Sequence, residues 1–278
     1  MPPKLGILAG NGDLPARIIQ ACRETGRDFF VLAFKNQTTP DVVAGQPHAW
    51  VRLGAAGKAV SLLREAGVEE VVMAGAIRRP SLSALRPDLW AAKVIAKAGF
   101  KAWGDDGLLS AIVRELEEGE GFRIIGPEFL LPGILAEEGV YGAISPDPMA
   151  LEDIARGIAV ARAIGALDIG QGAVVQQGLV LAVEAAEGTD ALLARCLPLK
   201  RGGPGGVLVK VRKPGQENRV DLPAVGIRTV EGAAAAGLRG IAVEAGGALI
   251  IDRRGVVEAA DRAGIFLLGT TVRPDQQG

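Results

Sequence analysis

The sequence predicts an α/β protein: a Rossmann-like, doubly wound N-terminal domain over residues 1–145 and a mixed α/β C-terminal domain over 146–278. In the first half, short apolar runs alternate with segments of helical periodicity, which is typical of a parallel sheet covered on both faces. Prolines at positions 146 and 148 exclude a continuous helix or a central strand there, so we place the domain boundary at that point. Beyond it the apolar runs alternate less regularly with helices, which indicates a mixed unit.

The elements of the first half alternate in a regular order. The apolar run 5–9 is expected to be a strand, followed by a glycine-rich turn and a helix over 14–25 that ends at Gly26. Ile18, Ile19 and Cys22 would share the buried face of that helix. The other predicted strands cover 28–34, 49–53, 68–74 and 122–125, and the other predicted helices cover 57–66 and 105–118.

The second half is predicted to begin with a helix over 149–165. Two strands, 173–176 and 179–184, would then pair as a hairpin around Gln177 and Gly178. The next helix is expected to start at Thr189. The other predicted strands cover 207–211, 224–227, 239–243, 248–251 and 265–268, with a helix over 255–263.

The composition excludes several function classes. Of 278 residues, 49% are hydrophobic, enough to bury a core, and 31 basic against 32 acidic residues give a net charge of −1. With so little net charge and 4% aromatic residues, no nucleic-acid partner is expected. A histidine-based triad would have to use His48, and the two cysteines, Cys22 and Cys196, form no zinc motif. Such sparse cysteines indicate a reducing compartment.

The chain carries no pattern of a signal peptide or a membrane span. Its longest stretch without a charged residue, 169–183, has fifteen residues, whereas a spanning helix needs about 20 mostly apolar ones. We therefore expect a soluble chain, for which contact with a membrane surface stays open.

A glycine-rich turn, Gly10-Asn11-Gly12, follows the first strand and precedes a helix. Such a turn can present backbone N–H groups to a phosphate, or its glycines can simply permit a tight turn, and the sequence leaves both explanations open. Pro15 replaces the third glycine of the dinucleotide-binding pattern, and Lys35 follows the second strand where an acid would bind a ribose. A nicotinamide cofactor is therefore not expected.

Two further loops could meet a ligand at the same edge of the sheet. Gly75 and Arg78 follow the strand 68–74, and Arg78 or Arg79 could bind a phosphate with its guanidinium, although a solvated loop with two surface arginines also explains them and is slightly favoured. Asp105 and Asp106 open a helix, where they could bind a metal ion or cap the helix.

The segment 200–223 holds the densest polar groups of the chain. Five cations precede its first acid, around a glycine-rich loop at 202–206, and Gln216, Arg219 and Asp221 follow. Cations beside a carboxylate suit a reaction at phosphorus, because they neutralise phosphate oxygens while the acid holds a divalent ion or orients water. A solvated basic hairpin is the structural alternative. The five cations are Lys200, Arg201, Lys210, Arg212 and Lys213.

Three long motifs resemble the UDP-2,3-diacylglucosamine pyrophosphatases of the LpxI type. They are Leu-Asp-Ile-Gly-Gln-Gly-Ala-Val-Val at 167–175, Glu-Ala-Ala-Glu-Gly-Thr-Asp at 184–190, and Lys-Pro-Gly-Gln-Glu-Asn-Arg-Val-Asp-Leu-Pro at 213–223. The opening 6–15, the Gly-Asp-Asp at 104–106 and the closing 265–269 also match, so the resemblance spans nearly the whole chain. Asn11 departs from the family, whose turn usually has another glycine there.

The resemblance implies hydrolysis of UDP-2,3-diacylglucosamine to UMP and 2,3-diacylglucosamine 1-phosphate (lipid X), with water attacking the α-phosphorus. It implies Mg²⁺ as cofactor and a role in lipid A biosynthesis, peripheral on the cytoplasmic face of the inner membrane. The essential aspartate of the family falls on Asp221, beside which Lys213 would stabilise phosphate charge. The expected metal ligands are Asp221, Asp190 and Glu184, and the expected substrate-binding residues are Gly10, Asn11, Gly12, Gly75, Arg78, Gln171, Thr189, Gln216 and Arg219.

Two functions other than hydrolysis are also compatible with the sequence. The Rossmann-like half would suit a nucleotide-sugar oxidoreductase, and the whole chain could be a non-catalytic nucleotide- or lipid-binding module. Two acyl chains would need an apolar groove, for which the segments 129–131 and 82–90 are candidate walls, although core packing also explains them. The oligomeric state, including a homodimer, stays open.

Overall fold

The computed structural model describes residues 2–78, 85–98 and 105–272, without the side chains of Asp105 and Asp106. The chain divides into two compact units. The first contains Met1–Pro132 and the short segment Glu217–Asp221, and the second contains Gly133–Gln216 and Leu222–Gly278. The chain therefore leaves the second unit at 216, contributes five residues to the first unit, and returns at 222.

This division differs from the boundary predicted at residue 145. The segment after Pro132 belongs to the second unit, because its strand β6 (Gly139–Tyr141) pairs antiparallel with β13 (Phe266–Thr270). The prolines near 148 mark a helix start instead. Pro148 opens helix α7 (Pro148–Ala166), and the Asp147 carboxylate caps it by accepting from the Ala150 N–H at 2.8 Å. Proline is favoured in the first helical turn, where its missing N–H costs no hydrogen bond.

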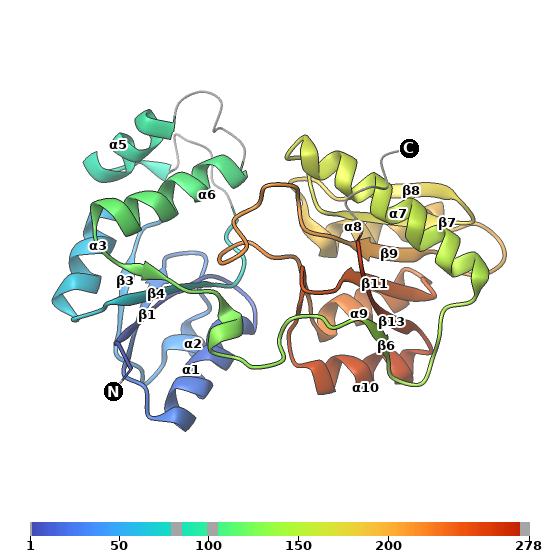
Figure 1. Cartoon of the computed structure of the whole chain (residues 1–278), viewed down its shortest axis with the longest axis horizontal. Helices are drawn as coiled ribbons and strands as arrows, with labels where there is room; N and C mark the ends of the chain where they lie inside the picture. The colour runs from blue at the N-terminus through green and yellow to red at the C-terminus, as the bar shows by residue number, and fades with distance from the viewer. Residues whose placement is uncertain (1, 79–84, 99–104, 273–278) are drawn as a thin grey trace. The chain divides into compact units, whose positions relative to one another are not determined.

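The first unit is a parallel five-stranded sheet with the order β3-β2-β1-β4-β5, which confirms the predicted α/β class. Figure 1 shows α1 and α2 on the opposite side of this sheet from α3, α5 and α6. The strands are β1 (Leu5–Ala9), β2 (Phe29–Phe34), β3 (His48–Val51), β4 (Glu70–Ala74) and β5 (Arg123–Ile124). The helices are α1 (Leu14–Thr25), α2 (Pro40–Val43), α3 (Ala56–Glu65), α5 (Leu89–Ala98) and α6 (Asp105–Arg114), which continues into a π-helical turn, Glu115–Gly119.

Local sequence explains these elements. Ile18, Ile19 and Cys22 of α1 are buried as predicted, and Gly26 ends the helix at φ 66° with its N–H bonded to the Arg23 carbonyl oxygen. Strands β1 and β4 are buried on both faces, as continuous apolar runs in a parallel sheet require. Leu63 of α3 and Leu116 of the π-helical turn belong to one buried cluster with the sheet.

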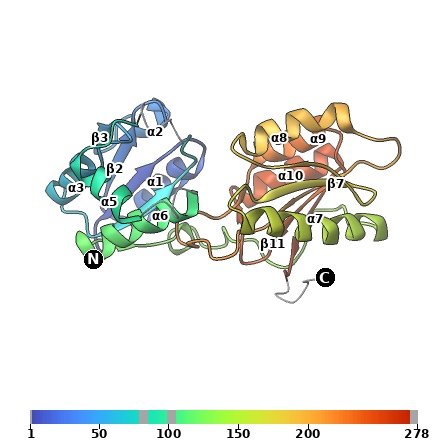
Figure 2. The same cartoon turned by 90° about the horizontal axis from the view of Figure 1, so that it is seen from above.

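The second unit is a six-stranded mixed sheet with the order β6-β13-β11-β9-β7-β8. Its centre, β9, β11 and β13, is parallel, and its outer strands β6, β7 and β8 are antiparallel to their neighbours. Figure 2 shows α7 on one face of this sheet and α8, α9 and α10 on the other. The remaining elements are β7 (Gly172–Gln176), β8 (Leu179–Val183), α8 (Gly188–Cys196), β9 (Val207–Lys210), β10 (Ala224–Val225), α9 (Ile227–Ala235), β11 (Gly240–Glu244), β12 (Leu249–Ile250) and α10 (Arg253–Ala263).

The predicted β7–β8 hairpin is present. Gln177 and Gly178 form its turn at φ 52° and 76°, and the buried Asp153 carboxylate of α7 accepts from both of their N–H groups at 3.0 and 2.7 Å. The glycine-rich loop after residue 200 is also fixed to this hairpin. The buried Gln176 amide donates to the Arg201 and Pro204 carbonyl oxygens and accepts from the Arg201 N–H.

Several elements lie outside the sequence-based prediction. The run 224–227 was expected to be one strand, but the strand ends at Val225 and helix α9 begins at Ile227. Gly226 separates them, with an extended backbone and an N–H bonded to Thr229 Oγ1 at 3.3 Å. Helices α2, α5 and α9 and strand β6 were not predicted. None of the helices formed by described residues is both long and apolar enough to cross a membrane.

Candidate functional site

At the carboxyl end of the first sheet, the loops after β1 and β4 are joined backbone to backbone. The Gly10 N–H donates to the Ala74 carbonyl oxygen at 2.7 Å, and Asn11 and Ala76 exchange two hydrogen bonds of 2.8 and 2.9 Å. A Cβ atom on Gly10 would lie 2.6 Å from the Ala76 carbonyl oxygen, and one on Gly75 would lie 2.4 Å from that of Asn11. These two glycines therefore let the loops approach each other.

The loop after β2 joins the same edge. The Gln37 side chain accepts from the Arg78 N–H at 2.8 Å and donates to the Arg78 carbonyl oxygen at 3.0 Å. Asn11 Oδ1 accepts from the Gly12 N–H at 2.8 Å. The structure thus brings the predicted residues of the loops after β1 and β4, namely Gly10, Asn11, Gly12, Gly75 and Arg78, to one edge, as expected for loops that follow parallel strands. The N–H groups of Gly10, Asn11 and Gly12 are bonded within the protein. Arg79 lies outside the described residues.

In the second unit, β9 ends at a buried lysine. Lys210 Nζ donates to Thr189 Oγ1 at 2.7 Å and to the Ala224 carbonyl oxygen at 3.3 Å, and Nζ lies 3.9 Å from Glu184 Oε1. Thr189 in turn donates to Glu184 Oε1 at 2.5 Å. The lysine and glutamate side chains are 5% and 8% exposed. The hydroxyl proton of Thr189 is therefore donated to Glu184, so this hydroxyl is not free to donate in the predicted substrate-binding role of Thr189.

A second lysine lies close in sequence, in the loop after β9. Lys213 Nζ bonds Asp168 Oδ1 at 2.7 Å, and its backbone N–H donates to Gln216 Oε1 at 2.9 Å. Gln216 Nε2 lies 3.5 Å from Gln171 Oε1. Three predicted residues, Lys213, Gln171 and Gln216, are thus gathered around this loop. Asp168 was not predicted as a site residue, since nothing in a single sequence pairs charges 45 positions apart.

The predicted metal ligands do not gather into one group. Among the described residues, no three His, Cys, Asp or Glu side chains are placed to hold a metal ion. Asp190 forms an exposed ion pair with Arg228, and Glu184 is occupied by Thr189 and Lys210. Asp221 belongs to the first unit. It is partly buried, and its N–H donates to the Glu217 carbonyl oxygen at 3.3 Å.

Arg219 binds two carboxylates. Its guanidinium contacts Glu117 Oε1 and Oε2 at 2.6 and 3.1 Å, and Glu217 Oε1 and Oε2 both at 2.9 Å. Hydrogen bonding to Arg219 lowers the pKa of Glu217, and the two carboxylates raise the pKa of Arg219. Arg219 was predicted to bind substrate, but in this structure its guanidinium holds protein carboxylates.

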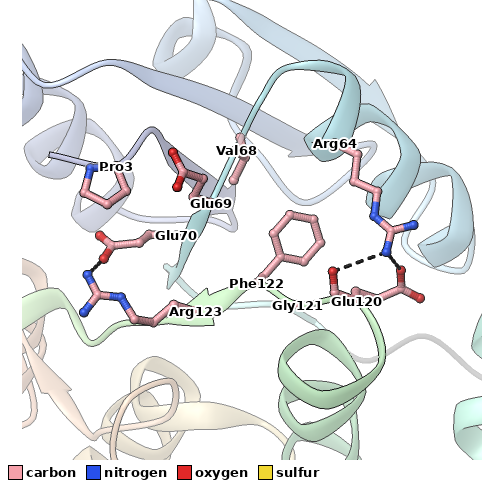
Figure 3. Close-up of a pocket in the computed structure, with 9 residues that line it drawn as sticks. All are labelled: Pro3, Arg64, Val68, Glu69, Glu70, Glu120, Gly121, Phe122 and Arg123. Atoms are coloured by element: carbon pink, nitrogen blue, oxygen red, sulfur yellow. Dashed lines mark hydrogen bonds and ion pairs between the residues drawn. The ribbon is translucent and has the colours of Figure 1, made fainter. Parts of the chain in front are cut away.

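Figure 3 shows a cavity of about 330 Å³ at the amino end of β4 and β5, which contains none of the predicted site residues. Four of its five charged side chains form ion pairs with one another: Arg64 with Glu120 at 2.6 Å, and the buried Glu70 with Arg123. The cavity therefore lies at the end of the first sheet opposite the loops of Gly10 and Gly75, and most of its charged groups are already paired. Its lining is Pro3, Arg64, Val68, Glu69, Glu70, Glu120, Gly121, Phe122 and Arg123.

The candidate acyl-groove residues differ in exposure. Phe129 is 72% and Leu89 is 92% exposed, while Leu130 and Leu131 are partly buried. Trp90 donates its indole N–H to Glu120 at 2.6 Å. Leu82 lies outside the described residues.

The fold and these polar groups define a two-domain α/β protein with a Rossmann-type first sheet and a second unit that buries two lysines, Lys210 and Lys213. The family models described as the LpxI N-terminal domain and the LpxI C-terminal domain match residues 4–134 and 137–268. A protein of Caulobacter vibrioides named UDP-2,3-diacylglucosamine pyrophosphatase LpxI is 45% identical, over 96% of this chain and 97% of its own length. The chain therefore belongs to the LpxI family, as the motif resemblance indicated.

Solved structures give weaker likenesses. The precorrin-6A reductase CobK is 13% identical, over 99% of this chain and 91% of its own, with a TM-score of 0.32. The biotin carboxylase domain of the Hydrogenobacter thermophilus 2-oxoglutarate carboxylase is 17% identical, over 71% of this chain and 40% of its own, with a TM-score of 0.27. At these scores neither structure carries an inference about this chain.

Proposed function

We propose that this chain hydrolyses the diphosphate of UDP-2,3-diacylglucosamine in lipid A biosynthesis, releasing UMP and 2,3-diacylglucosamine 1-phosphate. The observation that carries the proposal is the 45% identity, over nearly the full length of both chains, to a protein named for this pyrophosphatase activity. As a member of the LpxI family, the chain is a hydrolase that acts on a diphosphate bond.

In the proposed reaction, a water oxygen forms a bond to the α-phosphorus and the bond from that phosphorus to the bridging oxygen breaks. The bridging oxygen leaves on 2,3-diacylglucosamine 1-phosphate, and the proton lost by the water passes to solvent. Asp221 orients the water by accepting its hydrogen bond. Lys213, whose ammonium group pairs with Asp168, compensates the negative charge on the phosphates. The exposed Arg78 guanidinium binds phosphate at the edge of the first sheet.

Mg²⁺ is proposed as the cofactor, and the residues differ in how well they fit it. Mg²⁺ is commonly bound through one or two carboxylates, with water and substrate phosphate as the other ligands. Asp221 supplies one such carboxylate, at the end of the turn 217–221. Glu184 and Asp190 fit it poorly, because each lies beside a cation of the protein, Lys210 and Arg228. An ion bound at Asp221 would neutralise negative charge on the diphosphate.

The setting of the reaction is also a proposal. Because the proposed substrate carries two acyl chains, we propose that the enzyme is a peripheral protein at the cytoplasmic surface of the inner membrane. UDP-2,3-diacylglucosamine and lipid X are its ligands, and a homodimer is the proposed assembly.

The test is hydrolysis of UDP-2,3-diacylglucosamine in water enriched in ¹⁸O, with the products analysed by mass spectrometry. We expect ¹⁸O in UMP, loss of activity after chelation, and recovery with added Mg²⁺. Asp221→Asn should lower kcat by at least about 100-fold, while Asp41→Asn, a change at an exposed acid of α2, should not. Label in lipid X alone would place the attack at the other phosphorus. Tight binding without products would instead indicate a binding module.

A further inference from the structure

We infer that Glu117 and Arg219 are positioning residues for Asp221. Together with Glu217 they form what we call the Arg219 clamp, which fixes the segment 217–221 to the first unit. The inference rests on the proposed function of Asp221. It adds to that function a residue, Glu117, from a region of the sequence that carries none of the predicted site residues.

The clamp joins parts of the chain that are 102 residues apart. Arg219 makes a bidentate contact with Glu117 at 2.6 and 3.1 Å, and its Nη1 also donates to the Ile124 carbonyl oxygen of β5 at 3.3 Å. Nε and Nη2 contact Glu217. The planar guanidinium thus contacts three groups at once, which fixes its orientation as well as its position.

Glu117 is itself held in place. It lies in the π-helical turn that ends α6, and its Oε1 accepts from the Ile124 N–H at 3.3 Å. Leu116, the residue before it, is buried in the core of the first unit. A π-helical turn departs from ordinary helix geometry and is frequent at functional sites. Here the turn directs a carboxylate to the segment that carries Asp221.

Asp221 follows the clamp by two residues. The N–H groups of Val220 and Asp221 both donate to the Glu217 carbonyl oxygen, at 3.2 and 3.3 Å, so the five residues form one turn. Val220 packs against the buried cluster of the first unit. No strand or helix holds this segment, so the clamp and the Val220 contact are what join its backbone to the first unit and thereby help to position Asp221.

The charged groups of the clamp are partly exposed, at 34% for Arg219 and 31% for Glu117. Ion pairs with this exposure add little to folding stability. A displaced catalytic group, in contrast, lowers the rate steeply: a shift of about 1 Å can cost up to about 100-fold. Weakening the clamp should therefore affect turnover far more than stability.

The test compares kcat, KM and melting temperature for Arg219→Lys and Glu117→Gln, singly and together. Each single variant should lower kcat by about 10- to 100-fold, with KM within about twofold and the melting temperature unchanged. The kcat of the double variant should be no lower than that of the less active single variant, because both changes break the same contact. Arg64→Lys, which alters another ion pair of the same unit, is the control and should match the wild type.

Three outcomes would overturn the inference. A raised KM with unchanged kcat in Arg219→Lys would make Arg219 a substrate ligand. Unchanged kcat in both variants, with Asp221→Asn inactive, would leave the proposed function standing without the clamp. A melting temperature that falls in parallel with kcat would make the contact merely structural. A wild-type protein that forms no UMP would instead reject the proposed function itself.

Discussion

Replacing Lys210 by methionine should strongly destabilise the second unit. The change keeps an unbranched side chain of similar length but removes the ammonium group and its two hydrogen bonds, to Thr189 and Ala224. The Glu184 carboxylate would then lack a counter-charge while its side chain stays 8% exposed. Moreover, its Oε2 makes no hydrogen bond with any described residue. Removing one partner of a buried pair costs about 3–5 kcal/mol.

The loss of folding free energy in Lys210→Met can be measured by urea denaturation, with unfolding followed by circular dichroism. With a slope of about 1–3 kcal/mol per molar urea, a loss of about 3 kcal/mol lowers the midpoint by roughly 1–3 M. Lys210→Met combined with Glu184→Gln should recover much of it, because a neutral pair carries no unbalanced charge. Arg254→Met is the matched control: it breaks an ion pair of the same unit whose side chains are 89% and 51% exposed. A loss of at most about 1 kcal/mol is expected there.

A Lys210→Met midpoint equal to that of the control would refute this reasoning. It would mean that the pair is solvated in the folded protein. A double variant less stable than Lys210→Met would also contradict it, since the predicted cost is that of one unpaired buried charge.

Two further predictions use the shifted pKa values. Because Arg219 lowers the folded pKa of Glu217, the stability this pair contributes is present above the unfolded Glu pKa of about 4.3 and is lost as the pH falls through the folded value. The free energy of unfolding, measured by denaturation at a series of pH values, should therefore fall less between neutral and acidic pH in Arg219→Gln than in the wild type. An equal fall in both proteins would contradict this prediction. Burial raises the pKa of both Cys22 and Cys196 thiols, so a thiol reagent at neutral pH should modify them slowly in the folded protein and rapidly in urea. Rapid modification without denaturant would contradict their burial.

Much of the fold could be predicted from local sequence. The helix 14–25 ends at Gly26 as expected, because the glycine cap and the apolar face are encoded within a dozen residues. The β7–β8 hairpin follows from two short apolar runs around Gln177 and Gly178. Helix α9 was missed because a two-residue strand and a helix are continuous in the sequence, with only Gly226 between them.

The candidate site was predictable in part. The motifs identified the LpxI family, and they named Asp221, Lys213 and Gln216 as candidates. They did not indicate Glu117, because its contact with Arg219 joins positions 102 apart in the chain. They also assigned Glu184 to a metal, whereas its neighbour in the structure is Lys210. The sequence thus indicated which residue types could form the site, but not which side chains they contact in the folded protein.

By itself, the sequence determined the α/β class, the order of most elements and the family, because hydrophobic periodicity, caps and motifs are local properties of the chain. The tertiary structure alone decided that five residues around Arg219 belong to the first unit, and which carboxylates meet which cations. The physical reason is that the strength of a charge pair depends on burial and on geometry between distant segments. Only the packed sheets and helices fix those two quantities.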